Sequence, residues 1–184
     1  PIPSLLATSG LHHHLIRRGL RTQASIIVES GEPREVIHFA LLLGYGANAI
    51  CPHTVFSTIR ELAESEALEA PLLPGEAVDK YVTSVKKGLL KTFSRMGIST
   101  LRSFLGSQIF EAVGLGKELV ESYFTNTASR IGGIGLSEIA AETVARHRRG
   151  FPADGRWRNA DNLLDVGGVY QVRVDGERHL WTPE

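Results

Sequence analysis

The fold is decided by the stretch TQASIIVESGEPREVIHFALLLGYGANAICP, which runs from Thr22 to Pro52. Its first part, TQASIIVES, is an apolar and β-branched run closed by Gly31 and Pro33, which is typical of a buried strand followed by a turn. Apolar residues at helical spacing follow as far as Leu43, and ANAICP then reads as a second short strand. This order within about thirty residues predicts a βαβ unit with parallel strands and a right-handed crossover.

Helices are expected on both sides of a proline-rich break. Thr54 is placed to cap a helix that runs to about Glu64, and SEALEAPLLPGEA predicts a linker or domain boundary at residues 66–77. The next predicted helix, residues 78–95, carries a set of lysines away from its apolar face: Lys80, Lys86, Lys87 and Lys91. A surface helix needs such a solvated face, so this interpretation is favoured over a phosphate-binding patch.

The second half of the chain predicts short strands and helices in alternation. Residues 98–101 suit a strand that follows a glycine, and GSQIFEAVGL predicts a short helix ending at Gly114. Further helices are expected over residues 117–124 and from an N-cap at Ser137 to about Arg149, with acidic residues early and basic residues late. Alternation around an Asp-Gly pair predicts a β-hairpin over residues 168–181.

The composition is that of a globular protein with balanced charge. The chain has 184 residues, 42% of them hydrophobic, which is enough for a core in one domain or in two small ones. Twenty basic residues balance twenty acidic ones, so no global field attracts nucleic acid or an anionic membrane. No apolar run approaches the ~18 residues that cross a bilayer, and the start does not resemble a secretory signal. We therefore expect a cytoplasmic protein with neither nucleic-acid nor membrane partners.

Three features suggest chemistry, and each has a simpler structural interpretation. The glycines of RIGGIGL, residues 130–136, would let backbone N–H groups approach a phosphate, but they match neither GxGxxG nor GxxxxGKS, and a tight turn is favoured. The histidines at positions 12–14 lack further ligands at metal-binding spacing. Cys51 is the only cysteine, and a buried position at a strand end is favoured over a nucleophile activated by His53.

Long segments of the chain carry a resemblance to a known family. The first, GLHHHLIRRGLRTQASIIVESGEPREVIHFALLLGYGANAICP, is similar to the end of the central domain in the glutamate synthase family. KYVTSVKKGLLKTFSRMGISTLRSFLGSQIFEAVGL and YFTNTASRIGGIGLSEIAAETVARH resemble the start of its FMN-binding synthase domain, and LLDVGGVYQVRVDGERHLWTPE resembles the segment that follows. The resemblance covers essentially the whole chain. It implies that residues 1–73 end the central domain and that residues 74–184 begin the FMN-binding domain.

The fold implied by this resemblance is α/β. The parallel βαβ unit belongs to the central domain, and the helices and the β-hairpin after it open a (β/α)8 barrel that binds FMN. Members of the family release ammonia from glutamine and pass it through a tunnel. Ammonia and 2-oxoglutarate then form 2-iminoglutarate, which is reduced to glutamate with hydride from FMN. Electrons arrive through a 3Fe-4S cluster from ferredoxin or from an NADPH-oxidising small subunit.

The chain is expected to serve such an enzyme as one of its parts. One cysteine cannot supply three cluster ligands, so these lie outside the chain, and a flavin pocket needs most of a barrel. The partners implied are the remaining domains, glutaminase and barrel, together with 2-oxoglutarate and the electron donor. The implied process is ammonia assimilation in the cytoplasm, or in the plastid stroma of a photosynthetic eukaryote. A non-catalytic scaffold derived from glutamate synthase and a free-standing flavin-binding protein stay open as alternatives.

The expected binding residues are those that match the family's motifs. Arg95 precedes Met-Gly-Ile-Ser where the family has lysine, and its cation is expected to attract a carboxylate of 2-oxoglutarate. Ser99 is expected to donate a hydrogen bond to the substrate or to FMN. Gln108 matches the glutamine of the family's AQIFE motif, and its amide is expected to contact the keto acid. The family's SYRGAQ is SFLGSQ here, so Phe104 and Leu105 replace tyrosine and arginine.

Structural roles stay open for two of these residues. Arg95 also suits the C-terminal end of its own helix, where a cation complements the helix dipole. Gln108 also suits the first turn of a helix, bonded to backbone. No catalytic residue and no metal ligand is predicted within the chain.

Overall fold

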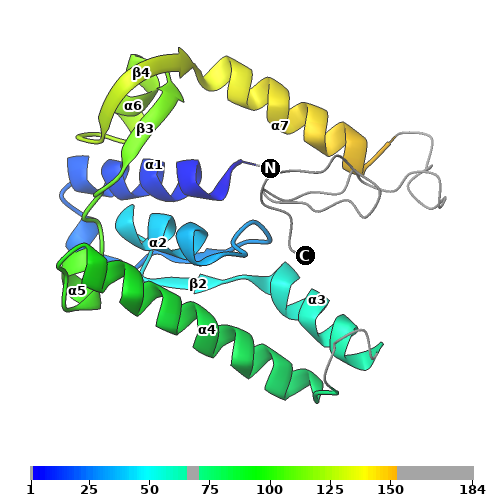
Figure 1. Cartoon of the computed structure of the whole chain (residues 1–184). Helices are drawn as coiled ribbons and strands as arrows, with labels where there is room; N and C mark the ends of the chain where they lie inside the picture. Colours follow the sequence, from blue (N-terminus) through cyan, green and yellow to red (C-terminus); the bar gives the residue numbers. More distant parts are fainter. Residues whose placement is uncertain (1, 66–70, 153–184) are drawn as a thin grey trace, which may run out of the picture. The chain divides into compact units, whose positions relative to one another are not determined.

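The structure, a computed structural model, describes residues 2–65 and 71–152 of a chain that divides into two units, Pro1–Val144 and Ala145–Glu184. The described residues form a mixed α/β fold with two parallel two-stranded sheets (Figure 1). The elements in chain order are α1 (Ser4–Arg17), the 3-10 helix η1 (Arg21–Gln23), β1 (Ile27–Glu29), α2 (Val36–Gly44), β2 (Ala49–Cys51), α3 (His53–Glu64), α4 (Pro74–Arg95), α5 (Leu101–Phe104), β3 (Glu111–Leu115), α6 (Lys117–Tyr123), β4 (Ala128–Ile134) and α7 (Leu136–Gly150).

The predicted βαβ unit is confirmed in the first half of the chain. β1 pairs in parallel with β2, with Ile27 opposite Ala49 and Glu29 opposite Cys51, and α2 connects the two strands. The buried residues of α2 contribute to clusters on more than one side, because the helix packs against α1, α4 and β2. α2 therefore buries apolar side chains on more than one face, while Ile37 in its first turn is 47% exposed.

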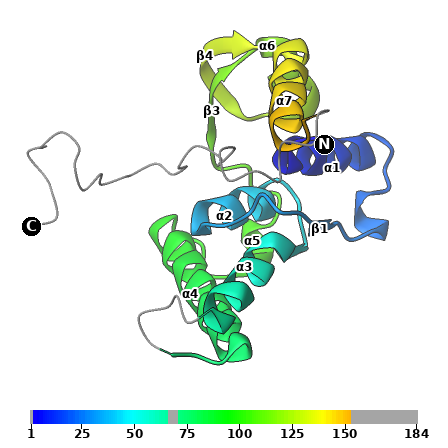
Figure 2. The same ribbon diagram turned by 90° about the vertical axis from the view of Figure 1, so that its right-hand side faces the viewer.

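α3 and α4 lie side by side, as Figure 2 shows. Tyr81 of α4 meets Phe39 of α2 and Phe56 of α3 in edge-to-face contacts. Its hydroxyl donates a hydrogen bond to the backbone carbonyl of Arg34 at 2.8 Å.

The lysines of α4 are exposed, which confirms the solvated face predicted for this helix. None of the helices within the described ranges is long and apolar enough to cross a membrane.

A second parallel pair lies in the other half of unit Pro1–Val144. β3 pairs with β4 in parallel, α6 connects them and α7 follows, so the chain contains two consecutive β/α units here. The pairing has two shifts in register. At one of them the backbones are so close that a Cβ atom on Gly133 would lie 2.2 Å from the carbonyl oxygen of Gly114. Only glycine fits at position 133.

Two elements predicted for this half are wrong. The strand expected over residues 98–101 is a loop followed by α5, because the hydroxyl of Thr100 accepts the N–H of Ser103 at 3.4 Å and caps a helix that begins at Leu101. The helix expected to end at Gly114 is β3 instead. Gly114 has φ of +77°, which an α-helix does not accommodate but an irregular strand does.

Further predictions differ from the structure in detail. RIGGIGL contributes the end of β4 rather than a simple turn, because its glycines allow the close approach of β3. α7 begins at Leu136, so Ser137 lies inside the helix and is not its N-cap. α3 begins at His53, and Thr54 does not cap it. No barrel is seen in residues 2–65 and 71–152, and the predicted hairpin at 168–181 lies outside the described residues.

Phe104 sits in the centre of the apolar cluster formed by α2, α4 and α5. It is 0% exposed, and its ring centroid lies 4.2 Å from that of Phe93 and 6.4 Å from that of Phe110. Leu105 packs against the same cluster. Phe104 and Leu105, two of the three positions at which SFLGSQ differs from SYRGAQ, therefore both serve packing in this chain.

Candidate functional site

The turn between α4 and α5 presents two of the three predicted binding residues. Gly97 adopts φ of +71°, and the N–H of Ile98 donates to the carbonyl of Phe93 at 2.9 Å, which closes the end of α4. Arg95 is the last residue of α4, and Ser99 follows the turn. Both are exposed, and neither side chain forms a hydrogen bond or ion pair with another described residue. Both are therefore available to a ligand.

Gln108 lies elsewhere, in the loop between α5 and β3. It is not part of a helix, which rules out the alternative role at a helix start. Its φ is +53°, and within the described part of the chain only Asn126, at +69°, is another non-glycine residue with positive φ. The backbone N–H of Gln108 donates to the carbonyl of Gly44 at 3.0 Å, and its Nε2 lies 2.8 Å from Nε2 of His13. Such strain of order 1 kcal/mol persists where the surroundings fix the residue, and it concentrates at functional sites.

His12, which lines the same region as this glutamine, is held by the half-buried Arg21. Nε of Arg21 donates to Nδ1 of His12 at 2.9 Å, and Nη2 of Arg21 donates to the carbonyl of Gly46 at 2.8 Å. Burial, followed by the charges of Arg21 and His13, lowers the pKa of His12 to about 4. Burial and the charge of Arg17 also lower the pKa of His13. Both imidazoles are therefore neutral at pH 7.

A polar cavity of about 400 Å³ opens between α1, the loop of Gln108 and the end of α6. Its lining includes His12, His13, Gln108 and Asn126. Both non-glycine residues with positive φ in the described ranges therefore face one cavity. Arg95 and Ser99 do not line it, so the structure does not bring the three predicted binding residues together there.

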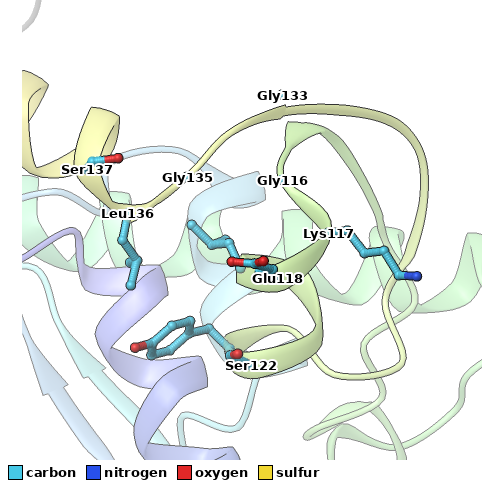
Figure 3. Close-up of a pocket in the computed structure, with 10 residues that line it drawn as sticks. Gly116, Lys117, Glu118, Ser122, Gly133, Gly135, Leu136 and Ser137 are labelled. Carbon is cyan, nitrogen blue, oxygen red and sulfur yellow. The ribbon is translucent and has the colours of Figure 1, made fainter.

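A second cavity, of about 660 Å³, lies at the carboxyl ends of β3 and β4 (Figure 3). Gly116 and Gly135 border it just before α6 and α7, which is where α/β proteins commonly bind ligands. The N–H of Gly135 donates to the carboxylate of Glu138 at 2.8 Å. Hydrogen bonds from the backbone of Glu138 itself and then of Gly135 lower the pKa of this carboxyl group. The carboxylate of Glu138 therefore already accepts the backbone N–H of Gly135 at the start of α7, and this N–H is not free to bind an anion from solution.

The described residues do not by themselves fit the cofactors implied by the resemblance. A flavin needs an enclosing pocket, but Ser99 is exposed and lines neither of these cavities. A 3Fe-4S cluster needs three cysteines, and Cys51, which ends β2, is the only one in the chain. Within the described ranges, no three His, Cys, Asp or Glu side chains are grouped to hold a metal ion.

Sequence reasoning missed His13 and Asn126 as neighbours of Gln108. The triple histidine was visible, but which of its rings faces the core depends on how α1 packs. Asn126 follows α6 in a turn, and asparagine tolerates positive φ better than most residues, which is the one signal that was available. His13 lies 95 positions before Gln108 in the sequence, so only tertiary packing brings these side chains together.

Known proteins similar to this chain are glutamate synthases. The family described as glutamate synthase central domain matches residues 1–116. The chain is 48% identical to glutamate synthase (NADPH) large chain of Bacillus subtilis (strain 168) and 42% identical to ferredoxin-dependent glutamate synthase of Cyanidium caldarium; each match covers 100% of this chain and 12% of the relative. It is 38% identical to glutamate synthase (NADH) of Schizosaccharomyces pombe, over 100% of this chain and 9% of the relative. The chain thus spans 12% or less of the length of these three relatives.

Proposed function

The chain belongs to the glutamate synthase family, and we propose that it acts as the part of that enzyme that joins its central domain to its FMN-binding domain. The observation that carries this proposal is similarity along the whole chain to large glutamate synthases. The central-domain match extends to residue 116, whereas the sequence prediction puts the domain boundary between residues 73 and 74. That boundary stays a prediction.

The activity proposed for the complete protein is the reductive synthesis of glutamate. Ammonia released from glutamine combines with 2-oxoglutarate to give 2-iminoglutarate, and FMN, when bound, supplies the hydride that reduces it. The cluster ligands lie outside this chain. Ferredoxin or an NADPH-oxidising small subunit delivers the electrons, and the process is ammonia assimilation in the cytoplasm or in the plastid stroma.

The second parallel strand pair supports a place at the opening of a barrel. β3, α6, β4 and α7 are two consecutive β/α units with parallel strands, which is the repeat of a (β/α)8 barrel. Val113 and Ile131 on these strands are 66% and 61% exposed. Parallel sheets are normally covered on both faces, so this pair requires further covering elements in the complete protein.

Arg95 and Ser99 are the proposed contacts to 2-oxoglutarate, and Ser99 is also the proposed contact to FMN. Their side chains are exposed, have no partner among the described residues and flank the turn at Gly97. Arg95 offers a planar fork of N–H donors that matches a carboxylate. Ser99 offers one hydroxyl, which donates to a substrate oxygen or to the flavin ring.

Gln108 is proposed to contact the keto acid from the loop before β3. Its bond to His13 uses the side-chain nitrogen and leaves the carbonyl oxygen and one N–H of the amide for a ligand. The left-handed backbone supports this role, because such a conformation on a residue other than glycine marks a position whose geometry matters.

The second candidate function is a non-catalytic scaffold derived from glutamate synthase. It is favoured by Phe104 and Leu105, which pack in an apolar cluster where the family has tyrosine and arginine. Steady-state kinetics of the protein that carries this chain separate the two candidates. For the enzyme, Arg95→Ala raises the KM for 2-oxoglutarate by about tenfold or more, since a charged hydrogen bond is worth about 1.5–3 kcal/mol.

The matched variants of this experiment are Arg95→Lys and Lys91→Ala. Arg95→Lys restores the charge found in the family, so it keeps the KM for 2-oxoglutarate within a few-fold of the starting value. Lys91→Ala removes an exposed cation one turn earlier on the same helix and leaves KM unchanged. If both Arg95 variants have the same KM for 2-oxoglutarate as the parent, Arg95 does not belong to the site. If the parent shows no turnover that depends on 2-oxoglutarate, the scaffold is favoured over the enzyme.

A further inference from the structure

The polar cavity beside Gln108 combines three features, and of its lining residues only Gln108 has a role in the proposed reaction. It has one cation and one anion at its rim, neutral polar groups inside and two residues held at positive φ. At about 400 Å³ it falls within the range of roughly 300–1,000 Å³ typical of small-molecule pockets. The chemistry of its lining decides which ligand fits.

The inside of the cavity presents a hydrogen-bond donor whose proton position is fixed. A guanidinium N–H can only donate, so the bond from Arg21 makes Nδ1 of His12 an acceptor and puts the proton of the neutral ring on Nε2. Nε2 of His12 forms no hydrogen bond with another described residue. The half-buried amide of Gln108 and the exposed amide of Asn126 line the same cavity, so this part of the lining matches a neutral polar group.

The rim of the cavity carries opposite charges that are not paired with each other. Nη1 of Arg17 donates to the backbone carbonyl of Ser122 at 3.3 Å, and the carboxylate of Glu121 lies 3.7 Å from Nζ of Lys117. Arg17 and Glu121 both line the cavity, and both are exposed. A ligand that carries a carboxylate and an ammonium group side by side is complementary to both.

We infer that this cavity binds a free α-amino acid with an uncharged polar side chain. Its carboxylate pairs with Arg17, its ammonium group pairs with Glu121, and its side chain meets the neutral groups at His12, Gln108 and Asn126. A simple carboxylate satisfies only Arg17, and a simple amine satisfies only Glu121, so each binds more weakly. The inference does not rest on the proposed function: it shares Gln108 with the proposed keto-acid contacts, but its charged partners, Arg17 and Glu121, have no role in that reaction.

The test is a titration of the full 184-residue chain, labelled with ¹⁵N, followed by NMR at the backbone amides of Gln108 and Asn126. The probe is L-asparagine, which is not a substrate of the proposed reaction. The expected result is a saturable shift of both amide signals, which acetate and methylamine at the same concentration do not reproduce. No shift up to the solubility limit of the probe, or an equal shift with acetate, overturns the inference.

Charge-removing variants show whether the two rim residues carry the binding. Arg17→Met and Glu121→Gln are each expected to weaken L-asparagine binding by about tenfold or more, as loss of a charge-assisted hydrogen bond requires. Arg18→Met, directly after α1, and Glu118→Gln, on α6, make the same charge changes outside the cavity and leave the affinity unchanged. Equal effects of the rim variants and their controls overturn the assignment of Arg17 and Glu121.

Discussion

The Nε2 atom of His13 lies 2.8 Å from the side-chain nitrogen of Gln108, although the two residues are 95 positions apart in the sequence. His13 is 6% exposed in the middle of α1, and Gln108 lies in the loop before β3 at φ of +53°. The bond therefore joins the first helix of the chain to a strained loop of the second half. It explains how a residue other than glycine is held in this conformation.

Replacement of Gln108 separates its side-chain bond from its backbone strain. Gln108→Ala loses the bond to His13 and keeps a Cβ atom in the left-handed region, whereas Gln108→Gly loses the same bond but relieves the strain. We expect the alanine variant to be less stable than the glycine variant by about 1 kcal/mol in urea denaturation. An alanine variant as stable as the glycine variant contradicts the strain.

Phe104 is predicted to be among the most costly positions to truncate. Phe104→Ala removes a fully buried ring that packs on Phe93 and Phe110, and we expect a loss of about 3–5 kcal/mol in the free energy of unfolding. Phe151→Ala is the matched control, because Phe151 is 70% exposed. A loss below about 1 kcal/mol for Phe104→Ala would show that the cluster does not depend on this ring.

The elements that the sequence predicted correctly are those with strong local patterns. The βαβ unit of β1, α2 and β2 follows from a β-branched run, a helical period and glycines at the turn. α4 and α6 follow from their apolar spacing. The failures at residues 98–101 and in the segment that ends at Gly114 have one cause, since short segments without a clear period are decided by caps and contacts such as Thr100 with Ser103.

The candidate sites were only partly predictable. Arg95, Ser99 and Gln108 came from motif similarity. In the structure Arg95 and Ser99 flank one turn and line neither of the cavities described above, whereas Gln108 lines the cavity of about 400 Å³. Their roles stay proposals. The cavity itself was not predictable, because α1, the loop before β3 and the end of α6 meet only through tertiary packing.

Gly46 is predicted to tolerate no side chain, for a reason that Gly19 does not share. Both have positive φ, +107° and +70°, but a Cβ atom on Gly46 would lie 2.3 Å from Nδ1 of His12, while nothing lies within 4 Å of one on Gly19. We expect Gly19→Ala to cost about 1 kcal/mol and Gly46→Ala clearly more, by thermal or urea denaturation. Equal costs would show that His12 yields without penalty.

The stability of the fold is predicted to depend on pH through His12. Its pKa is about 4 in the folded chain and 6.5 in its ordinary state, so the unfolded chain binds more protons between these values. The stabilisation from neutral His12 is complete above pH 6.5. It is lost as the pH falls from 6.5 through about 4, because the unfolded chain takes up its proton first. Denaturation at several pH values is expected to show a flatter dependence for His12→Gln than for the parent chain.

The control for this experiment is His14→Gln on the same helix. His14 is exposed, so its replacement is expected to leave the pH dependence as it is in the parent chain. If His12→Gln and the parent chain lose stability in parallel between pH 6.5 and 4, His12 is not the group that titrates.

The most direct test of the central claim follows the amide nitrogen of glutamine in the complete protein that carries this chain. The protein is supplied with glutamine labelled with ¹⁵N in its side-chain amide, 2-oxoglutarate and either reduced ferredoxin or NADPH with the small subunit. If the chain is part of a glutamate synthase, the label appears in the α-amino group of newly formed glutamate. Label that stays in glutamine, or that leaves only as free ammonia with every donor, would contradict the account.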